Sequence, residues 1–188
     1  MANVNHSTLT DPYLHEPKGV AAASSGSVYV SNGAGSGAWV HPHHYVSAYV
    51  AFDSSTPESQ SITTTFSALN PTIALKENSG FTALSSPNAR IRYDESEDMI
   101  ATISFSTSIR HAAGASRNVE LAVYLNGTIL AGAHTIVTSD SNEWTNVALV
   151  GQCEINEDDY IEIFAKASQA ITLETASAFL TVTGIYKP

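Results

Sequence analysis

Apolar and polar residues alternate along the second half of the chain, as they do in strands that bury one face. The clearest run is residues 99–106, where every second side chain is apolar: Met99, Ala101, Ile103 and Phe105. Further strands are expected at 119–125, 128–138, 144–150, 160–167 and 178–186. No stretch of this half repeats with the period of a helix. The pattern therefore predicts an all-β fold.

Turn signals separate the expected strands. Asn126-Gly127 follows an alternating run and is the strongest hairpin signal in the sequence. Gly151 is expected to end the strand that begins at Trp144, and residues 156–159 form a polar turn. Two weaker strands are expected at 45–52 and 61–66, between prolines that favour edges and loops. About eight to ten strands result, which suits a two-sheet jelly-roll β-sandwich.

The first 50 residues or so have a different composition, rich in Gly, Ser, Ala, Pro and His. Pro12 and Pro17 leave room for one helical turn at most, and Val28–Val30 is a short strand followed by a glycine-rich stretch. Such a segment buries too little apolar surface to offset its ordering entropy. We expect an extended arm at 1–45, which becomes ordered on a partner, and a sandwich head at 46–188.

Charge narrows the classes of partner. The net charge is −10, and the 8 basic residues are scattered. An acidic chain is repelled by phosphate, so neither nucleic acid nor an anionic membrane is an expected partner. The first residues lack the basic and apolar regions of a signal peptide, and no apolar run is long enough to span a membrane. Synthesis in a cytosol, with assembly into a particle there, is expected.

Two parts of the sequence resemble a known family. Residues 9–20 (LTDPYLHEPKGV) and 27–39 (SVYVSNGAGSGAW) resemble the N-terminal arm of bacteriophage head-decoration, head-fibre and minor structural proteins. Residues 89–188 are similar to the C1q/TNF-like jelly roll at the ends of phage fibres. The last strand there often reads aromatic, four residues, glycine and apolar, here Phe179, Gly184 and Ile185. The resemblance implies a homotrimer attached to a virion, with no catalytic residue.

The candidate site residues follow from this resemblance and from the enrichment of aromatic residues in interfaces. The capsid-binding arm would use Leu14, His15, Glu16, Pro17, Lys18, Gly19, Val20, Tyr29 and Trp39. The trimer interface would use Tyr160, Phe164, Phe179, Ile185 and Tyr186. The alternative is that some of these aromatic residues belong to the second face of the sandwich itself.

The sequence gives little support for a metal site, a disulfide or a catalytic site. His41, His43 and His44 are the candidates for a metal site near a threefold axis, with a solvated or packed strand start as the alternative. Cys153 is the single cysteine, so no intrachain disulfide and no zinc pattern is possible. The hydrolase motifs GxSxG and HExxH are absent. We expect neither a cofactor nor an enzymatic activity.

The function expected from the sequence is that of a virion structural protein. It would be made in the host cytoplasm and would decorate and cement the capsid exterior, with the major capsid protein as its partner and three arms acting together. The alternative is a receptor- or glycan-binding head or tail fibre protein, with a host-surface glycan as a further partner. A cellular C1q-like interaction module is a third hypothesis.

Overall fold

The computed structural model describes residues 23–31, 34, 37–50, 56–70, 74–112 and 114–187, with the backbone alone at 46–50. Contacts divide the chain into a unit that ends at Pro42 and a larger unit from His43 to Lys187. The predicted arm residues 14–20 lie outside the described residues. Within the described ranges, no helix is long and apolar enough to cross a membrane.

A two-stranded hairpin forms the described part of the first unit. Strands β1 (Val28–Ser31) and β2 (Gly37–Val40) pair antiparallel, which places Tyr29 opposite Trp39. Their rings meet edge to face with centroids 5.4 Å apart. Gly37 has no Cβ, and one built there would collide with the carbonyl oxygen of Val30. The sequence predicted β1 but not β2, because its glycine-rich flank reads as a strand terminator rather than as a close approach of two strands.

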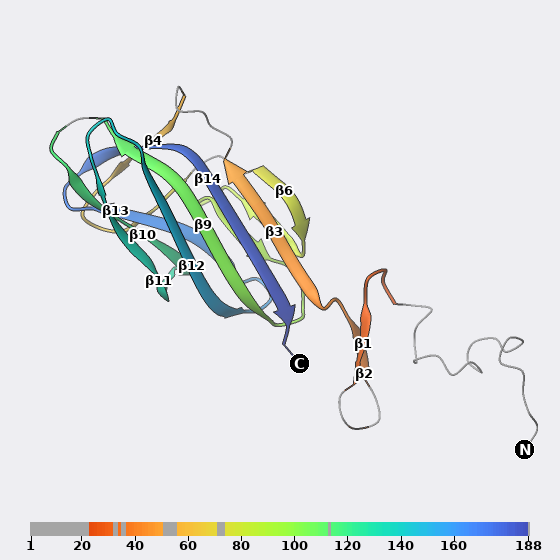
Figure 1. Cartoon of the computed structure of the whole chain (residues 1–188). Coiled ribbons are helices and arrows are strands. Elements are labelled where there is room, and N and C mark those ends of the chain that lie inside the picture. The colour runs from red at the N-terminus through yellow and green to blue at the C-terminus, as the bar shows by residue number, and fades with distance from the viewer. Residues whose placement is uncertain are drawn as a thin grey trace, which may run out of the picture. The chain divides into compact units, whose positions relative to one another are not determined.

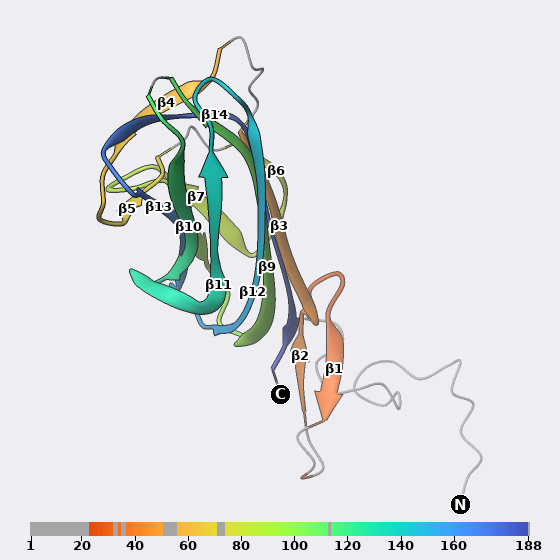
Figure 2. The ribbon, with the colours of Figure 1, turned by 60° about the vertical axis from the view of Figure 1, so that its left-hand side comes forward.

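The second unit is a sandwich of two antiparallel sheets (Figures 1 and 2). The first sheet has the order β12-β9-β14-β3-β6, with β4 also paired to β14. Its strands are β3 (His43–Val50), β4 (Glu58–Ile62), β6 (Ala74–Ser79), β9 (Met99–His111), β12 (Thr145–Ile155) and β14 (Ile171–Tyr186). Figure 1 shows β12, β9, β14, β3 and β6 side by side.

The second sheet has the order β11-β10-β13-β8-β7, with β5 also paired to β13. Its strands are β5 (Ser67–Ala68), β7 (Phe81–Leu84), β8 (Arg90–Tyr93), β10 (Arg117–Leu125), β11 (Thr128–Ser139) and β13 (Tyr160–Ala167). From β8 to β14 the chain alternates between the sheets, except that β10 and β11 are joined as a hairpin within one of them. Together with β3 beside β14, this is jelly-roll connectivity. The prediction of an all-β jelly roll is confirmed.

The core lies between the two sheets. On β9, Met99, Ala101 and Ile103 are fully buried, which confirms the alternation read from the sequence. Val119 and Leu121 of β10 pack in the same cluster from the second sheet. Period-two burial fixes the register of both strands, because a slip by one residue would expose the whole apolar row.

Several strand boundaries differ from the prediction. β12 does not end at Gly151 but continues to Ile155, and Gly151 is buried opposite Ile103. β14 begins at Ile171 instead of residue 178, because a register shift between Thr175 and Ser177 lets the strand continue through a bulge. A bulge of this kind breaks the alternation on which the prediction relied.

The expected strand at 61–66 was also wrong, since β4 ends at Ile62. After Ile62 the chain passes to the second sheet, where the Thr63 carbonyl accepts a hydrogen bond from the Ala167 amide at 2.8 Å. The side chain of Gln60 holds this crossing in place. It donates to the Ala68 carbonyl at 2.7 Å and accepts from the Asn70 amide at 2.9 Å.

The predicted hairpin at Asn126-Gly127 is confirmed. Both residues have positive φ, 52° and 73°, as a type I′ turn requires. The Asn126 side chain also binds the predicted polar turn: it donates to Asp159 at 2.6 Å and accepts from the Tyr160 amide at 2.9 Å. The two turns are therefore fixed to each other at one end of the second sheet.

Candidate interaction surfaces

The outward side of β9, β12 and β14, with the adjoining Tyr45 of β3, carries no charged residue between the ends of these strands, and we call it the neutral face. It consists of Asn146, Ala148, Val150 and Gln152 on β12, Ile100, Thr102, Ser104, Ser106 and Ser108 on β9, Phe179, Thr181, Thr183 and Ile185 on β14, and Tyr45 on β3. Hydroxyl groups and apolar side chains alternate across it. Its strands pair in register, so that these residues form straight rows across the sheet.

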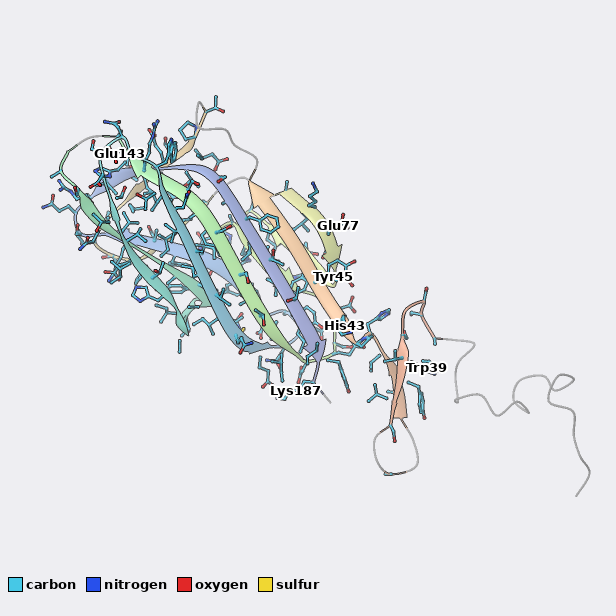
Figure 3. All side chains as sticks on the ribbon, in the orientation of Figure 1. Trp39, His43, Tyr45, Glu77, Glu143 and Lys187 are labelled. Carbon is cyan, nitrogen blue, oxygen red and sulfur yellow. The ribbon has the colours of Figure 1, made fainter. Side chains whose placement is uncertain are left out.

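Five large apolar side chains stand exposed on the neutral face. Tyr45, Ile100, Val150, Phe179 and Ile185 are each 44–58% exposed. Ile100 and Ile185 are directly opposite each other on β9 and β14. Tyr45 lies near the same end of the sheet, two residues from His43 on β3 (Figure 3). Exposed apolar groups gathered on one sheet face mark an interaction surface more often than an ordinary solvated one.

Charged groups border the neutral face at both ends of its strands, and the exposed Glu77 borders it on the edge strand β6. At one end Lys187 pairs with Glu154, and Figure 3 shows Lys187 just beyond β14. At the other end Arg110 pairs with Glu174, and its guanidinium lies 4.5 Å from the ring centre of Trp144. The field between these pairs is uncharged. Such a surface costs less to dehydrate than a charged one, which favours the binding of a partner.

The outward side of the second sheet is different, and we call it the aromatic face. It consists of Tyr124, Phe164, Tyr160 and Phe66 together with Glu120, Glu162, Lys166, His134 and Arg90. The rings of Tyr124 and Phe164 stack with centroids 3.9 Å apart and planes at 18°. Phe66, from the segment before β5, meets Tyr124 edge on at 5.9 Å.

One carboxylate on the aromatic face is buried. Glu162 points outward from β13 between Tyr160 and Phe164, yet only 4% of it is exposed. It accepts a hydrogen bond from the Asn88 side chain at 3.0 Å. Next to it, the Arg90 guanidinium lies 4.6 Å from the centre of the Tyr160 ring.

A second carboxylate, Glu120, contacts both Lys166 and His134. Lys166 Nζ and His134 Nε2 each lie 3.0 Å from Glu120 Oε2, and Lys166 also lies over the Phe66 ring at 4.7 Å. Burial acts to raise the pKa of Glu120. The hydrogen bonds and charges of Lys166 and His134 outweigh it and lower the pKa below its ordinary value.

The predicted trimer residues are divided between these two surfaces. Phe179 and Ile185 are exposed on the neutral face. Tyr160 and Phe164 lie on the aromatic face, where each ring contacts a neighbouring side chain. Tyr186 is half-buried at the end of β14, opposite the buried Met99. The structure therefore places two of the five on each surface and the fifth at the end of β14, and the interface itself stays a prediction.

Three apolar members of the neutral face, Tyr45, Ile100 and Val150, were not among the predicted interface residues. The signal that marks them lies in the sequence: each occupies the polar half of an alternating strand, where serine and threonine are the usual residues. The prediction was based on aromatic residues of the last strands. It therefore left out Ile100 and Val150, the aliphatic residues on the outward sides of β9 and β12.

The histidine candidates do not converge. His43 and His44 are consecutive residues of β3, so their side chains point to opposite faces; His43 is exposed and His44 is buried against Tyr93. His41 belongs to the other unit, where Ser27 Oγ lies 3.5 Å from its Nε2. Among the residues that the structure describes, no three His, Cys, Asp or Glu side chains form a group able to hold a metal ion.

Comparisons with known proteins return structural similarity alone. No protein-family model matches the chain, and no curated protein matches it by sequence. Among solved structures, Eiger TNF from S. frugiperda is 5% identical with a TM-score of 0.47, and covers 77% of this chain and 95% of its own. Murine APRIL is 13% identical with a TM-score of 0.46, covering 76% and 99%. The PRD1 vertex protein P5 is 10% identical with a TM-score of 0.43, covering 77% and 97%.

Proposed function

We propose that this protein is a non-enzymatic structural protein of a virion, which trimerises through the neutral face and decorates the capsid through its N-terminal arm. Self-association is supported by the five large apolar side chains that are exposed on the neutral face. The virion assignment is supported by the resemblance of residues 9–39 to phage head proteins. The assignment of three chains to the oligomer is supported by the resemblance of residues 89–188 to C1q/TNF-like heads.

Charge favours a second copy of this chain as the occupant of the neutral face. Two copies with net charge −10 repel each other, so they associate most easily where neither presents a carboxylate. The described members of the neutral face include no carboxylate. Glu154 and Glu174 at the ends of its strands are each paired with a cation, and the exposed Glu77 lies at its edge on β6. In a closed ring of three copies each copy buries the same residues, so the neutral face would be covered on all three.

The arm would attach the trimer to the shell. Isolated two-stranded hairpins are marginally stable in water, so β1–β2 gains from a partner surface. The Tyr29–Trp39 pair gives it a compact aromatic anchor. Each arm alone binds modestly, and three arms on one trimer gain through effective concentration.

The mass of the protein in solution tests the self-association. Light scattering should give three times the 19.9 kDa chain mass. Val150→Lys places a charge in the neutral face and should give the single-chain mass. Ile136→Lys is the matched control, because Ile136 on β11 is as exposed as Val150 (56% against 58%) but lies on the opposite sheet. If Val150→Lys remains a trimer, the neutral face is not the interface.

Binding to purified shells tests the capsid role. Tyr29→Ala with Trp39→Ala should leave the trimer intact and abolish co-sedimentation with capsids that lack this protein. Full binding by this variant and by a chain that lacks residues 1–40 would rule out the arm.

A second function, recognition of a receptor or glycan by the head, is favoured by one specific observation. The aromatic face combines stacked rings with a buried carboxylate, a pairing that structural packing does not require on an outward sheet surface.

A further inference from the structure

We propose that the aromatic face holds a binding site for a neutral oligosaccharide, formed by Tyr124, Phe164 and Glu162. This inference rests on the second function above and gives it a location and a ligand class. It is independent of the capsid role and of the arm.

The rings supply the apolar half of the site. Tyr124 and Phe164 come from neighbouring strands, and their stacking at 3.9 Å holds both in one orientation. Both rings are partly exposed, so apolar ring surface remains available to a ligand. Sugars present C–H groups on one side of the pyranose ring, and such groups pack on aromatic surfaces. Side chains held in place before binding lose little entropy on binding.

Glu162 supplies the polar half. A carboxylate has about four acceptor positions, and among the described residues a single hydrogen bond, from Asn88, reaches it. No described residue forms an ion pair with it. Burial of a carboxylate with one donor is costly unless further donors arrive. The hydroxyl groups of a sugar lying on the neighbouring rings are donors of the right kind.

The charges around the site favour a neutral sugar over an acidic one. Lys166 and His134 are engaged by Glu120, and Arg90 lies over Tyr160. A carboxylated sugar would meet Glu162 on a chain of net charge −10. An apolar protein partner would have to cover Glu162 without giving it a donor. A ligand that is uncharged and rich in hydroxyl groups satisfies both the rings and the carboxylate.

Binding to an array of immobilised oligosaccharides tests the proposal with the full-length protein. The array carries neutral glucose, galactose, mannose and N-acetylglucosamine oligomers, with sialylated oligosaccharides as the acidic comparison. We expect at least one neutral oligomer to bind. Glu162→Gln keeps the shape and the acceptor for Asn88, and should weaken binding about tenfold or more. Tyr124→Leu should weaken it by a similar factor.

Two controls separate the site from the fold and from the assembly. Glu143→Gln, the same change at an exposed carboxylate that belongs to neither face, should bind as the unchanged protein does. In the unchanged protein, NMR resonances of Tyr124, Glu162 and Phe164 should shift when the best neutral oligomer is added. Light scattering on the same samples reports the trimer. An unchanged protein that binds the oligomer as a single chain would contradict the neutral-face interface and not this site.

The proposal is overturned by any of four results. The first is that no neutral oligomer binds at millimolar concentration. The second is that sialylated oligosaccharides alone bind. The third is that the resonances that shift lie away from the aromatic face. The fourth is that Glu162→Gln binds with unchanged affinity.

Discussion

Gly151 of β12 and Ala133 of β11 lie so close that a Cβ on residue 151 would come within 2.6 Å of the Ala133 Cβ. The two strands belong to different sheets, so this contact sets how closely the sheets approach at their β11–β12 edge. Leu130 closes the same gap, with its Cδ2 at 2.8 Å from that position. Gly151 thus makes a close contact between sheets rather than a break in a strand.

Gly151→Ala should therefore destabilise the sandwich. The added methyl group has to displace Ala133 and Leu130, and overpacking of this kind costs about 1–3 kcal/mol. The free energy of unfolding in urea measures it. Ala131→Ser, at an exposed position of β11 outside the neutral face, should change the free energy by less than about 0.5 kcal/mol. An equal effect of both changes would show that the close contact carries no strain.

The fold could be predicted from the sequence where local signals agree with the final structure. The alternating run at 99–106 and the Asn126-Gly127 turn each carry their own period or backbone requirement, and both are confirmed. Gly151 and the start of β14 could not be predicted. Their conformations depend on Leu130 and Ala133 in the other sheet, and on a bulge, which are contacts distant in sequence.

The surfaces were harder to predict than the strands. The sequence identifies Phe164 and Phe179 as aromatic residues on strands, but only the sheet order shows that they lie on opposite sides of the sandwich. Asn88 and Glu162 are 74 residues apart, and no local pattern predicts their hydrogen bond. Sites assembled across strands require the topology before they can be recognised.

Asn126 should be important for stability beyond its turn conformation. Asn126→Ala removes the hydrogen bonds to Asp159 and from the Tyr160 amide, and places a residue with a Cβ and no side-chain amide at φ 52°. We expect a loss of about 2 kcal/mol. Asn126→Gly relieves the backbone but not the lost hydrogen bonds, so it should recover part of this loss. Thermal unfolding of both variants measures the two contributions, and equal stability of the two would contradict the role of the backbone.

The neutral face predicts that stability depends on protein concentration. When association is coupled to folding, the melting temperature rises with concentration. The unchanged protein should show this rise between micromolar and hundred-micromolar samples in calorimetry. Ile100→Asp with Ile185→Asp places carboxylates at two cross-strand positions and should abolish the dependence. A dependence that persists in this variant would point to another interface.

Glu120 should contribute stability that is lost in acid. Its pKa is lowered in the folded protein, so the contribution is present above the unfolded value of 4.5 and disappears as the pH falls through the folded value. At pH 7, Glu120→Gln should cost up to about 1 kcal/mol, because the ion pair with Lys166 and the hydrogen bond with His134 are partly exposed. At pH 3 the variant and the unchanged protein should unfold at similar urea concentrations. A difference that grows in acid would contradict the direction of the shift.

Cys153 should react slowly with thiol reagents. Burial on β12, and in smaller part the charge of Asp159, raise the pKa of its thiol from 9.0 to about 11. The thiolate is the reactive form, so at pH 8 the folded protein should react about 100-fold more slowly than a thiol of ordinary pKa. The rate of alkylation by iodoacetamide, measured from pH 7 to 11, should still rise at the upper end. The same thiol in guanidinium chloride should level off above pH 9 and serves as the control. If the alkylation rate of the folded protein levels off at the same pH as that of the unfolded protein, burial does not raise the pKa of Cys153.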